Sequence, residues 1–367
     1  MNQGKLARRL MSALGGLAIA SIPLAAQGSG SAPVAEPGYT ISVFATGTAS
    51  YSKPDSATTD GHFVFIGYQN NAASDGTSGS STIVQYRMNG SVVRSYVVQG
   101  KNDGLRINPL TGKLWAVRNE DGNAKLSIIN PRTGAQTEYA FPEPAPHGGG
   151  YDDLAFTRSG AFVSASAPNP DSAGKFTQPA VDRIEIHNGA IVLTPILMGN
   201  ATAINRTSGQ QEQLNLSDPD ALAIDAAGGL VLTSQADAES VFIRNPGTNQ
   251  QQVSVLHTVT QTDETAWMPQ RGGEDQGEQS GDHGNSGRRV QGQFLITDAS
   301  ANATYLLNKS GGFSAGWAYT EAPADSSTLA GTVGVLDQHT GAITPVAHVV
   351  SPHAILWLPA GQNEGGD

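Results

Sequence analysis

The sequence predicts an all-β protein folded as a single β-propeller, because a strand-rich module recurs along it and its composition suits tight turns. The clearest copy is Ser217–Ser234 (SDPDALAIDAAGGLVLTS): a polar opening that ends in Asp220, an apolar run, a turn and a second apolar run. Short apolar runs bounded by Gly, Asn, Asp and Pro are typical of strands and turns. With 44 Gly, 20 Pro and 14% charged residues, the chain favours turn-rich β-structure over helices.

Weaker copies of this opening recur along most of the chain. Aligned on the acid, the openings carry Asp55, Asp103, Asp152, Asp220, Glu264 and, in the last copy, His353. The first five lie 48, 49, 68 and 44 residues apart, and spacings of this size are typical of one four-stranded antiparallel blade per copy. We therefore predict six blades. Seven is the alternative, because the 89 residues from Glu264 to His353 leave room for a degenerate blade near 322–333.

The two ends of the folded part are both strand-like. Tyr39–Thr46 (YTISVFAT) alternates like a strand, and Ala354–Leu358 (AILWL) is an apolar run. In closed propellers the first and last strands usually share one blade, so we expect the termini to close one blade together. The propeller is expected to span 39–360. We expect Trp115, Trp267 and Trp357 to belong to the core between blades.

Segments outside the blades have their own compositions. Residues 1–28 read as an export signal, with Lys5, Arg8 and Arg9 before an apolar centre and small residues for cleavage near 26–28. The apolar centre is too short and broken for stable membrane insertion, so a secreted or periplasmic bacterial protein is expected, with general or twin-arginine export both open. Residues 29–38 are expected to be a flexible linker, 269–291 a flexible insertion loop and 361–367 a disordered tail.

Charge and cysteine content limit the possible partners. The net charge of −11 disfavours nucleic acid and anionic membranes, whereas cations remain possible. The absence of cysteine excludes disulfides, thiol catalysis and Cys-ligated metals. We expect a monomer with a small-molecule or glycan ligand at the mouth of the central channel.

The aligned acids are the candidate site. The first residue of each innermost strand of a propeller sits beside the channel, so the openings should bring their acids together. Oxygen ligands favour Ca²⁺, with Mg²⁺ or Zn²⁺ as alternatives. The candidate metal ligands are Asp55, Asp152, Asp220 and Glu264, the candidate proton-transfer groups are Asp103 and His353, and the candidate substrate-binding pair is Asp152 and Asp153. The competing interpretation is that these acids cap turns by accepting hydrogen bonds from backbone amides.

Two short stretches resemble the SMP-30/gluconolactonase family of six-bladed propellers. Asp152–Gly160 (DDLAFTRSG) is similar to its N-D-L-A-x-D-x-x-G stretch, and Pro219–Ala223 (PDALA) to its P-N-G-L-A. The resemblance implies a divalent cation in the channel and hydrolysis of lactones or phosphoesters. Asp220 would then replace the metal-binding Asn, and Asp152 the Asn that lines the substrate pocket. The family's E-G-P glutamate has no clear match, and Asp55 is nearest in position. NHL-repeat and streptogramin-lyase-like propellers contain similar stretches.

Three other functions remain open. A non-catalytic propeller could bind a protein or glycan partner on its loop-rich face. A streptogramin-lyase-like enzyme would need a His–Glu pair, for which His353 and Glu264 are the candidates. Gly312–Gly316 (GFSAG) and His147–Gly150 (HGGG) fit the nucleophile elbow and oxyanion loop of serine hydrolases, but no amphipathic helix flanks Ser314, which disfavours that reading.

Overall fold

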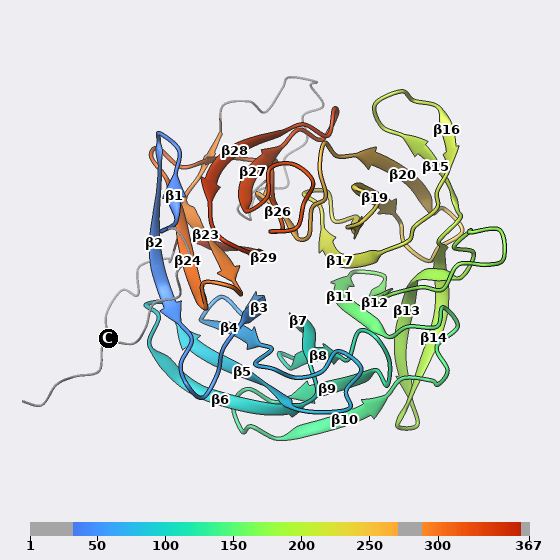
Figure 1. Cartoon of the computed structure of the whole chain (residues 1–367), viewed down its shortest axis with the longest axis horizontal. Coiled ribbons are helices and arrows are strands. Elements are labelled where there is room, and N and C mark those ends of the chain that lie inside the picture. The colour runs from blue at the N-terminus through green and yellow to red at the C-terminus, as the bar shows by residue number, and fades with distance from the viewer. Residues whose placement is uncertain (1–31, 271–287, 361–367) are drawn as a thin grey trace, which may run out of the picture.

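The structure is a computed structural model that describes residues 32–270 and 288–360. Its strands form six blades around a central channel, as the sequence predicts (Figure 1). The predicted export signal 1–28, the tail 361–367 and most of the predicted loop 269–291 lie outside the described residues. Within the described part of the chain, no helix is long and apolar enough to cross a bilayer.

The first four blades follow one another in sequence, each from its innermost strand outward. Blade 1 contains β3 (Pro54–Thr59), β4 (Phe63–Tyr68), β5 (Ser80–Arg87) and β6 (Val92–Gln99). Blade 2 contains β7 (Asn102–Ile107), β8 (Leu114–Arg118), β9 (Lys125–Ile129) and β10 (Gln136–Ala140). Blade 3 contains β11 (Tyr151–Thr157), β12 (Gly160–Ala165), β13 (Pro179–His187) and β14 (Ala190–Met198). Blade 4 contains β17 (Pro219–Ile224), β18 (Leu230–Ser234), β19 (Glu239–Arg244) and β20 (Gln252–His257).

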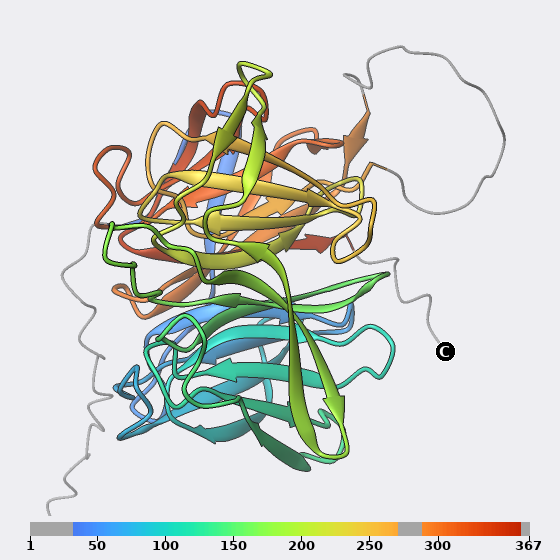
Figure 2. The same ribbon diagram turned by 90° about the vertical axis from the view of Figure 1, so that its right-hand side faces the viewer.

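Blade 4 is extended by a hairpin that precedes it in the sequence. The hairpin consists of β15 (Thr202–Asn205) and β16 (Gln211–Gln213), and β15 pairs in parallel with the outer edge of β20. Figure 2 shows this yellow-green hairpin projecting from the rim of the propeller. It accounts for the long interval between the acids of blades 3 and 4.

Blades 5 and 6 are interleaved in the sequence. Blade 5 contains β21 (Thr265–Trp267), β26 (Ala318–Ala322), β27 (Thr332–Leu336), β28 (Ile343–His348) and β1 (Val34–Ala35). Blade 6 contains β29 (Pro352–Pro359), β23 (Gly292–Asp298), β24 (Ala303–Lys309) and β2 (Tyr39–Thr46). The chain therefore leaves blade 5 after one strand, lays down two strands of blade 6, and then returns. The 89-residue interval holds this excursion, and the segment 322–333 is part of blade 5, so the seven-blade alternative is wrong.

Both ends of the described chain close the ring. β2 is the outermost strand of blade 6 and β29 the innermost, which confirms that the first and last long strands share a blade. β1 lies within the predicted linker 29–38, yet it pairs with β28 at the edge of blade 5. The end of the predicted insertion loop is also ordered, because β22 (Arg289–Val290) pairs with β25 (Phe313–Ser314).

Each interface between neighbouring blades is filled by its own apolar cluster. Between blades 1 and 2, for example, Phe65 and Ile83 pack with Leu105 and Leu114, all fully buried. Five further clusters occupy the other five interfaces. Trp115 and Trp267 are buried in two of these clusters and Trp357 packs against a third, as expected from the sequence. Burial on both faces explains why the inner strands are continuous apolar runs.

Candidate functional site

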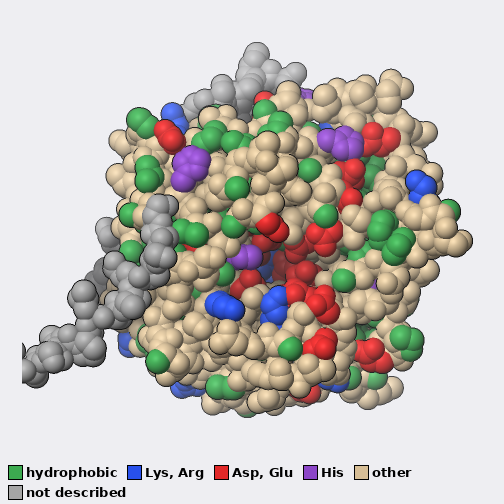
Figure 3. Space-filling model, in the orientation of Figure 1, with side chains coloured by type: hydrophobic (Ala, Val, Ile, Leu, Met, Phe, Trp, Pro, Cys, Tyr) green, Lys and Arg blue, Asp and Glu red, His purple; other side chains and the backbone are tan. Residues whose placement is uncertain are grey.

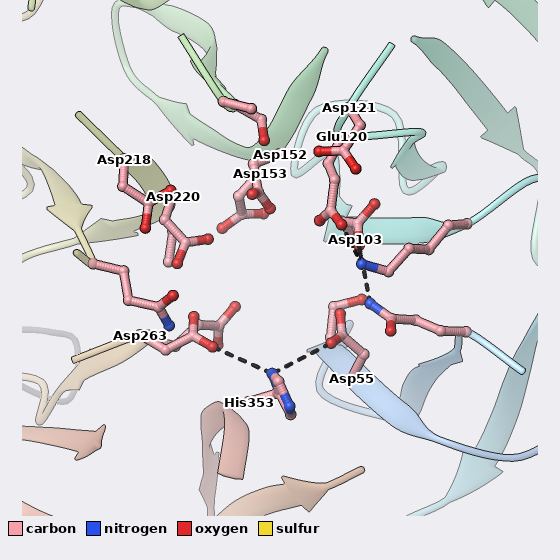
Figure 4. Close-up of a pocket in the computed structure, with 18 residues that line it drawn as sticks. Asp55, Asp103, Glu120, Asp121, Asp152, Asp153, Asp218, Asp220, Asp263 and His353 are labelled. Atoms are coloured by element: carbon pink, nitrogen blue, oxygen red, sulfur yellow. Dashed lines mark hydrogen bonds and ion pairs between the residues drawn. The ribbon is translucent and has the colours of Figure 1, made fainter. Parts of the chain in front are cut away.

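The predicted ring of acids forms at one mouth of the channel. All six aligned residues line a single cavity of about 310 Å³, which Figure 3 shows as a hollow surrounded by acidic side chains. Its ten carboxyl side chains are Asp55, Asp103, Glu120, Asp121, Asp152, Asp153, Asp218, Asp220, Asp263 and Glu264. Lys101 and His353 are the basic side chains that line it. The described residues therefore bring a large excess of negative charge into one enclosed space (Figure 4).

A β-bulge places most of the aligned residues. On β3, β7, β11 and β17 the register with the next strand shifts at the aligned acid. There the acid and the residue after it lie opposite a single residue of the partner strand. On β29 the pairing passes over His353 in the same way. A bulge breaks the in-and-out alternation of a strand and redirects a side chain. The repeated bulge is thus the device that turns these side chains into the channel.

Glu264 is placed by a different contact. It directly precedes β21, and its backbone N–H donates to the Glu321 carboxylate at 3.0 Å. Glu321 is fully buried on β26, and burial together with the neighbouring acids raises its pKa well above the usual value. The backbone position of Glu264, the fifth acid of the ring, is therefore held by the buried carboxyl group of Glu321 on the second strand of its blade.

Lys101 neutralises two acids on the side of blade 2. Its Nζ lies 3.3 Å from Asp103 Oδ1 and forms a second ion pair with Glu120. The Gln69 amide also donates to Asp103 Oδ1, at 2.9 Å. Burial alone would lower the pKa of Lys101, but Asp103, Glu120 and Asp55 outweigh it and raise the pKa above its usual value. Lys101 therefore carries a positive charge across the whole physiological range.

His353 lies between two acids on the side of blade 6. Its Nδ1 is 3.6 Å from Asp55 Oδ1 and 3.5 Å from Asp263 Oδ2 (Figure 4). Burial raises the pKa of Asp55 to about 6, against the lowering effect of His353. Burial and the neighbouring Glu264 raise the pKa of Asp263 well above its usual value. An imidazole held in this way can exchange a proton with a molecule in the cavity.

Arg106 lies at the bottom of the cavity and binds two more of its acids, Asp153 and Glu264. This β7 residue, on blade 2, donates to Asp153 at 2.6 Å, to Glu264 at 3.0 Å and to the Leu222 carbonyl at 3.0 Å. Glu264 Oε2 in turn accepts the N–H of Ile355 at 3.3 Å. One guanidinium and its partners therefore connect blades 2, 3, 4, 5 and 6 across the channel. A second cavity of about 320 Å³ lies beyond Arg106 and has mostly apolar walls, among them Phe156, Trp267 and Trp357.

Four acids that line the cavity form no ion pair among the described residues: Asp121, Asp152, Asp218 and Asp220. Asp121 is exposed and accepts a hydrogen bond from the Ser74 hydroxyl, so the other three are the candidates for binding a cation. Burial raises the pKa of Asp152 and of Asp220 well above the usual value, with added repulsion from Asp220 on Asp152 and from Asp263 on Asp220, and burial also raises the pKa of Asp218. Carboxylates in this situation either hold protons or attract a cation from outside the protein.

The chemistry of these donors fits a hard cation. They are all oxygen ligands, and two further buried carboxylate oxygens of the cavity, Asp103 Oδ2 and Asp153 Oδ1, accept no hydrogen bond from any described residue. Calcium takes six to eight such oxygens, supplied by carboxylates, carbonyls and water. In the described part of the chain, no three His, Cys, Asp or Glu side chains already stand in metal-coordinating geometry. Of the predicted ligands, Asp152 and Asp220 stay available, whereas Asp55 faces His353 and Glu264 is held by Arg106.

Sequence reasoning found the ring and His353 but missed the other two basic side chains and three acids. Lys101, Arg106, Glu120, Asp121 and Asp218 stand outside the aligned column. Lys101 stands two residues before the aligned acid, as Lys53 does in the first opening. Arg106 interrupts the inner strand Asn102–Ile107, and an arginine within a buried strand is itself an indication of a buried acidic partner. The predicted His353–Glu264 pair is absent, because His353 faces Asp55 and Asp263.

The serine-hydrolase motifs have structural explanations. Ser314 lies in the short strand β25 and its Oγ accepts a hydrogen bond from Arg289 at 3.1 Å. The glycines of His147–Gly150 allow close backbone approach: a Cβ on Gly149 would lie 2.0 Å from the Ser166 carbonyl oxygen, and one on Gly150 2.3 Å from that of Asn119. The glycine run thus lets the chain enter β11 tightly packed, just before Asp152, and the motif pair does not assemble a nucleophile elbow.

Comparison with known proteins gives only distant matches. No protein-family model matches the sequence, and no curated protein matches it. Virginiamycin B lyase from Staphylococcus aureus aligns over 74% of this chain and 99% of its own, at 12% identity and a TM-score of 0.43. The periplasmic gluconolactonase of Pseudomonas aeruginosa aligns over 83% of this chain and 88% of its own, at 12% identity and a TM-score of 0.41.

A third alignment is shorter. It is with a protein of unknown function from Bacteroides caccae, and it covers 54% of this chain and 58% of that protein, at 12% identity and a TM-score of 0.34. Similarity at this level carries no information about activity. The six-bladed propeller is established by the strand pairing of the chain itself.

Proposed function

We propose that this propeller binds a hard divalent cation, Ca²⁺ first among them, at Asp152, Asp218 and Asp220, and uses it to hydrolyse a lactone or related ester. The observation that carries the proposal is the charge partition of the cavity. Lys101, His353 and Arg106 each face two acids, which leaves these three and the exposed Asp121 without a basic partner among the described residues. A cation from solution would complete the pattern, and oxygen-only ligands favour Ca²⁺ or Mg²⁺ over Zn²⁺.

The remaining groups have roles that suit ester hydrolysis. A bound divalent ion would polarise the substrate carbonyl. His353 opens onto the same cavity, so it can accept a proton from water while Asp55 and Asp263 stabilise the imidazolium. Asp103 is less suited to this role than the sequence suggests, because Lys101 and Gln69 already occupy its Oδ1. Most of the cavity surface is polar, which favours a small hydrophilic substrate.

Calcium binding tests the first part of the proposal. Isothermal titration calorimetry should detect one Ca²⁺ per chain, and Asp152→Asn and Asp220→Asn should each weaken it by about 100-fold, since even outer-shell changes cost 10–100-fold. Glu185→Gln, on the exposed part of β13, makes the same change in net charge and should leave binding unaltered. A wild-type protein that binds no divalent ion would contradict the proposal.

Turnover tests the second part. A panel of small lactones should be hydrolysed by the calcium-loaded wild type, and removal of Ca²⁺ with a chelator should abolish turnover. Calcium binding without hydrolysis of any lactone would indicate the alternative, a non-catalytic propeller that binds a ligand at this mouth.

A further inference from the structure

The Lys101 ammonium occupies a position between two carboxylates that a metal ion could otherwise fill. It pairs with Asp103 and Glu120, in the half of the cavity beside blade 2, while Asp152, Asp218 and Asp220 line the half beside blades 3 and 4 (Figure 4). We propose that Lys101 is a built-in cation that fills one half of the acidic cavity and limits the protein to a single bound divalent ion. The inference deepens the proposed function and rests on it for the ion in the other half.

The position of the Lys101 backbone is fixed. Its N–H donates to Asn119 Oδ1 at 3.1 Å, and its carbonyl oxygen accepts the Asn119 N–H at 2.8 Å. Gly100, with φ of 84°, packs so closely that a Cβ there would lie 2.0 Å from Asn119 Oδ1. Because Asn119 holds the backbone on both sides, the lysine side chain starts from a defined point and reaches into the cavity with 19% of its surface exposed.

The acids around Lys101 have unused capacity for a cation. Asp103 is 94% buried, since its relative exposure is 6%, and within the described part of the chain its Oδ2 accepts no hydrogen bond. Glu120 and Asp55 also lie close enough to Lys101 to raise its pKa. Without the ammonium, Asp103, Glu120 and the Gln69 side chain could supply oxygen ligands in this half of the cavity, beside Asp55, which also faces His353. A divalent ion is the natural replacement for the lost positive charge.

A tethered ammonium and a free ion have different consequences. The lysine supplies one positive charge to its half of the cavity in every molecule, at any calcium concentration, and it repels a second ion there. A divalent ion from solution can therefore bind only in the other half of the cavity, at Asp152, Asp218 and Asp220. Lys101 acts, in this account, as the residue that determines the number and position of bound ions.

The test is a count of bound ions. Calorimetric titration with CaCl₂ should give one Ca²⁺ per chain for the wild type and two for Lys101→Met. Lys125→Met, which removes a lysine from β9 of the same blade but not from the cavity, should still bind one. The double variant Lys101→Met/Asp103→Asn should return to one ion, because it removes one of the acids that would hold the second.

Each outcome separates the inference from the proposed function. If the wild type and Lys101→Met both bind one ion with equal affinity, Lys101 has a structural role only and the inference is wrong. If the wild type binds none and Lys101→Met binds one, Lys101 still fills its half of the cavity as a built-in cation, but the proposed function and the limit to one ion both fall. Should Lys101→Met be unstable, millimolar Ca²⁺ is expected to restore its melting temperature toward that of the wild type. Failure to fold even in saturating Ca²⁺ would overturn the inference, since an ion in the vacated position should replace the ammonium.

Discussion

Replacing Arg106 with methionine should destabilise the whole ring. The substitution keeps most of the side-chain volume but removes the donors to Asp153 at 2.6 Å, Glu264 at 3.0 Å and the Leu222 carbonyl at 3.0 Å. Removing one partner of a buried ion pair costs about 3–5 kcal/mol, because the remaining charge stays buried without compensation. We therefore expect Arg106→Met to lower the free energy of unfolding by about 3–5 kcal/mol at pH 8.

The loss should depend on pH in a defined direction. Burial raises the pKa of Glu264 from 4.5 to about 7 even with Arg106 present, and Arg106 is a group that lowers it. Without Arg106 the folded-state pKa of Glu264 rises further. A raised folded-state pKa contributes stability that is present below the unfolded pKa and lost as pH rises through the folded pKa. The destabilisation should therefore be larger at pH 8 than at pH 5, where protonation removes the unpaired charge.

Urea unfolding at the two pH values measures this effect. Arg94→Met is the matched control, because Arg94 is an exposed residue of β6 that donates to two carbonyl oxygens of a neighbouring turn and pairs with no buried acid among the described residues. Its loss should cost under about 1 kcal/mol. A loss below about 1 kcal/mol for Arg106→Met, or an equal loss at pH 5 and pH 8, would refute the account of Arg106 as the residue that links the blades.

Three further substitutions probe other parts of the account. Asp182→Asn should stabilise the protein by up to about 3 kcal/mol above pH 6 and by little near pH 4 in urea titrations, because burial raises the pKa of Asp182 from 3.8 to about 6; an equal gain at both pH values, or the same gain from exposed Asp171→Asn, would count against this. His353→Gln should abolish lactone hydrolysis while calorimetry still shows calcium binding; unchanged turnover would remove His353 from the proposed chemistry. Gly150→Ala should lower the free energy of unfolding by about 1–3 kcal/mol and weaken calcium binding, because its Cβ would lie 2.7 Å from the Glu120 carbonyl oxygen; a variant as stable as the wild type would show that this close approach is unimportant.

The sequence predicted those parts of the site that are repeated at the start of each inner strand. Each inner strand begins with the same polar opening, so alignment of the openings located Asp55, Asp103, Asp152 and Asp220 at equivalent positions, and ring closure then brought them together. The interleaving of blades 5 and 6 could not be predicted in the same way. The Gly292–Asp298 strand, β23, follows the opening of blade 5 in sequence, but on its inner side it pairs with β29. Nothing in the local sequence indicates that this inner partner lies about 60 residues further along the chain rather than next to it.

The ion pairs of Lys101 and Arg106 could not be predicted from the repeats either. Arg106 occurs in one blade only, and the lysine position of Lys101 recurs only as Lys53, so alignment of the copies on their acids gave these two residues no weight. Their importance comes from distances across the channel, such as that from Arg106 to Glu264, which are 158 residues apart in sequence. Which acid pairs with which base depends on the side chains that face each other once the ring has closed. These side chains come from five different blades.

The interleaved order of blades 5 and 6 also constrains how the ring can be assembled. A chain emerging from its N-terminus completes blades 1 to 4 one after another, but it cannot finish blade 5 before two strands of blade 6 have been made. The innermost strand of blade 6 arrives last and must insert beside β23, whose other neighbour β24 already pairs with β2. Contacts between such distant segments form slowly. We therefore expect the last third of the propeller to fold as one cooperative unit rather than blade by blade, and removal of β29 to unravel two blades instead of one.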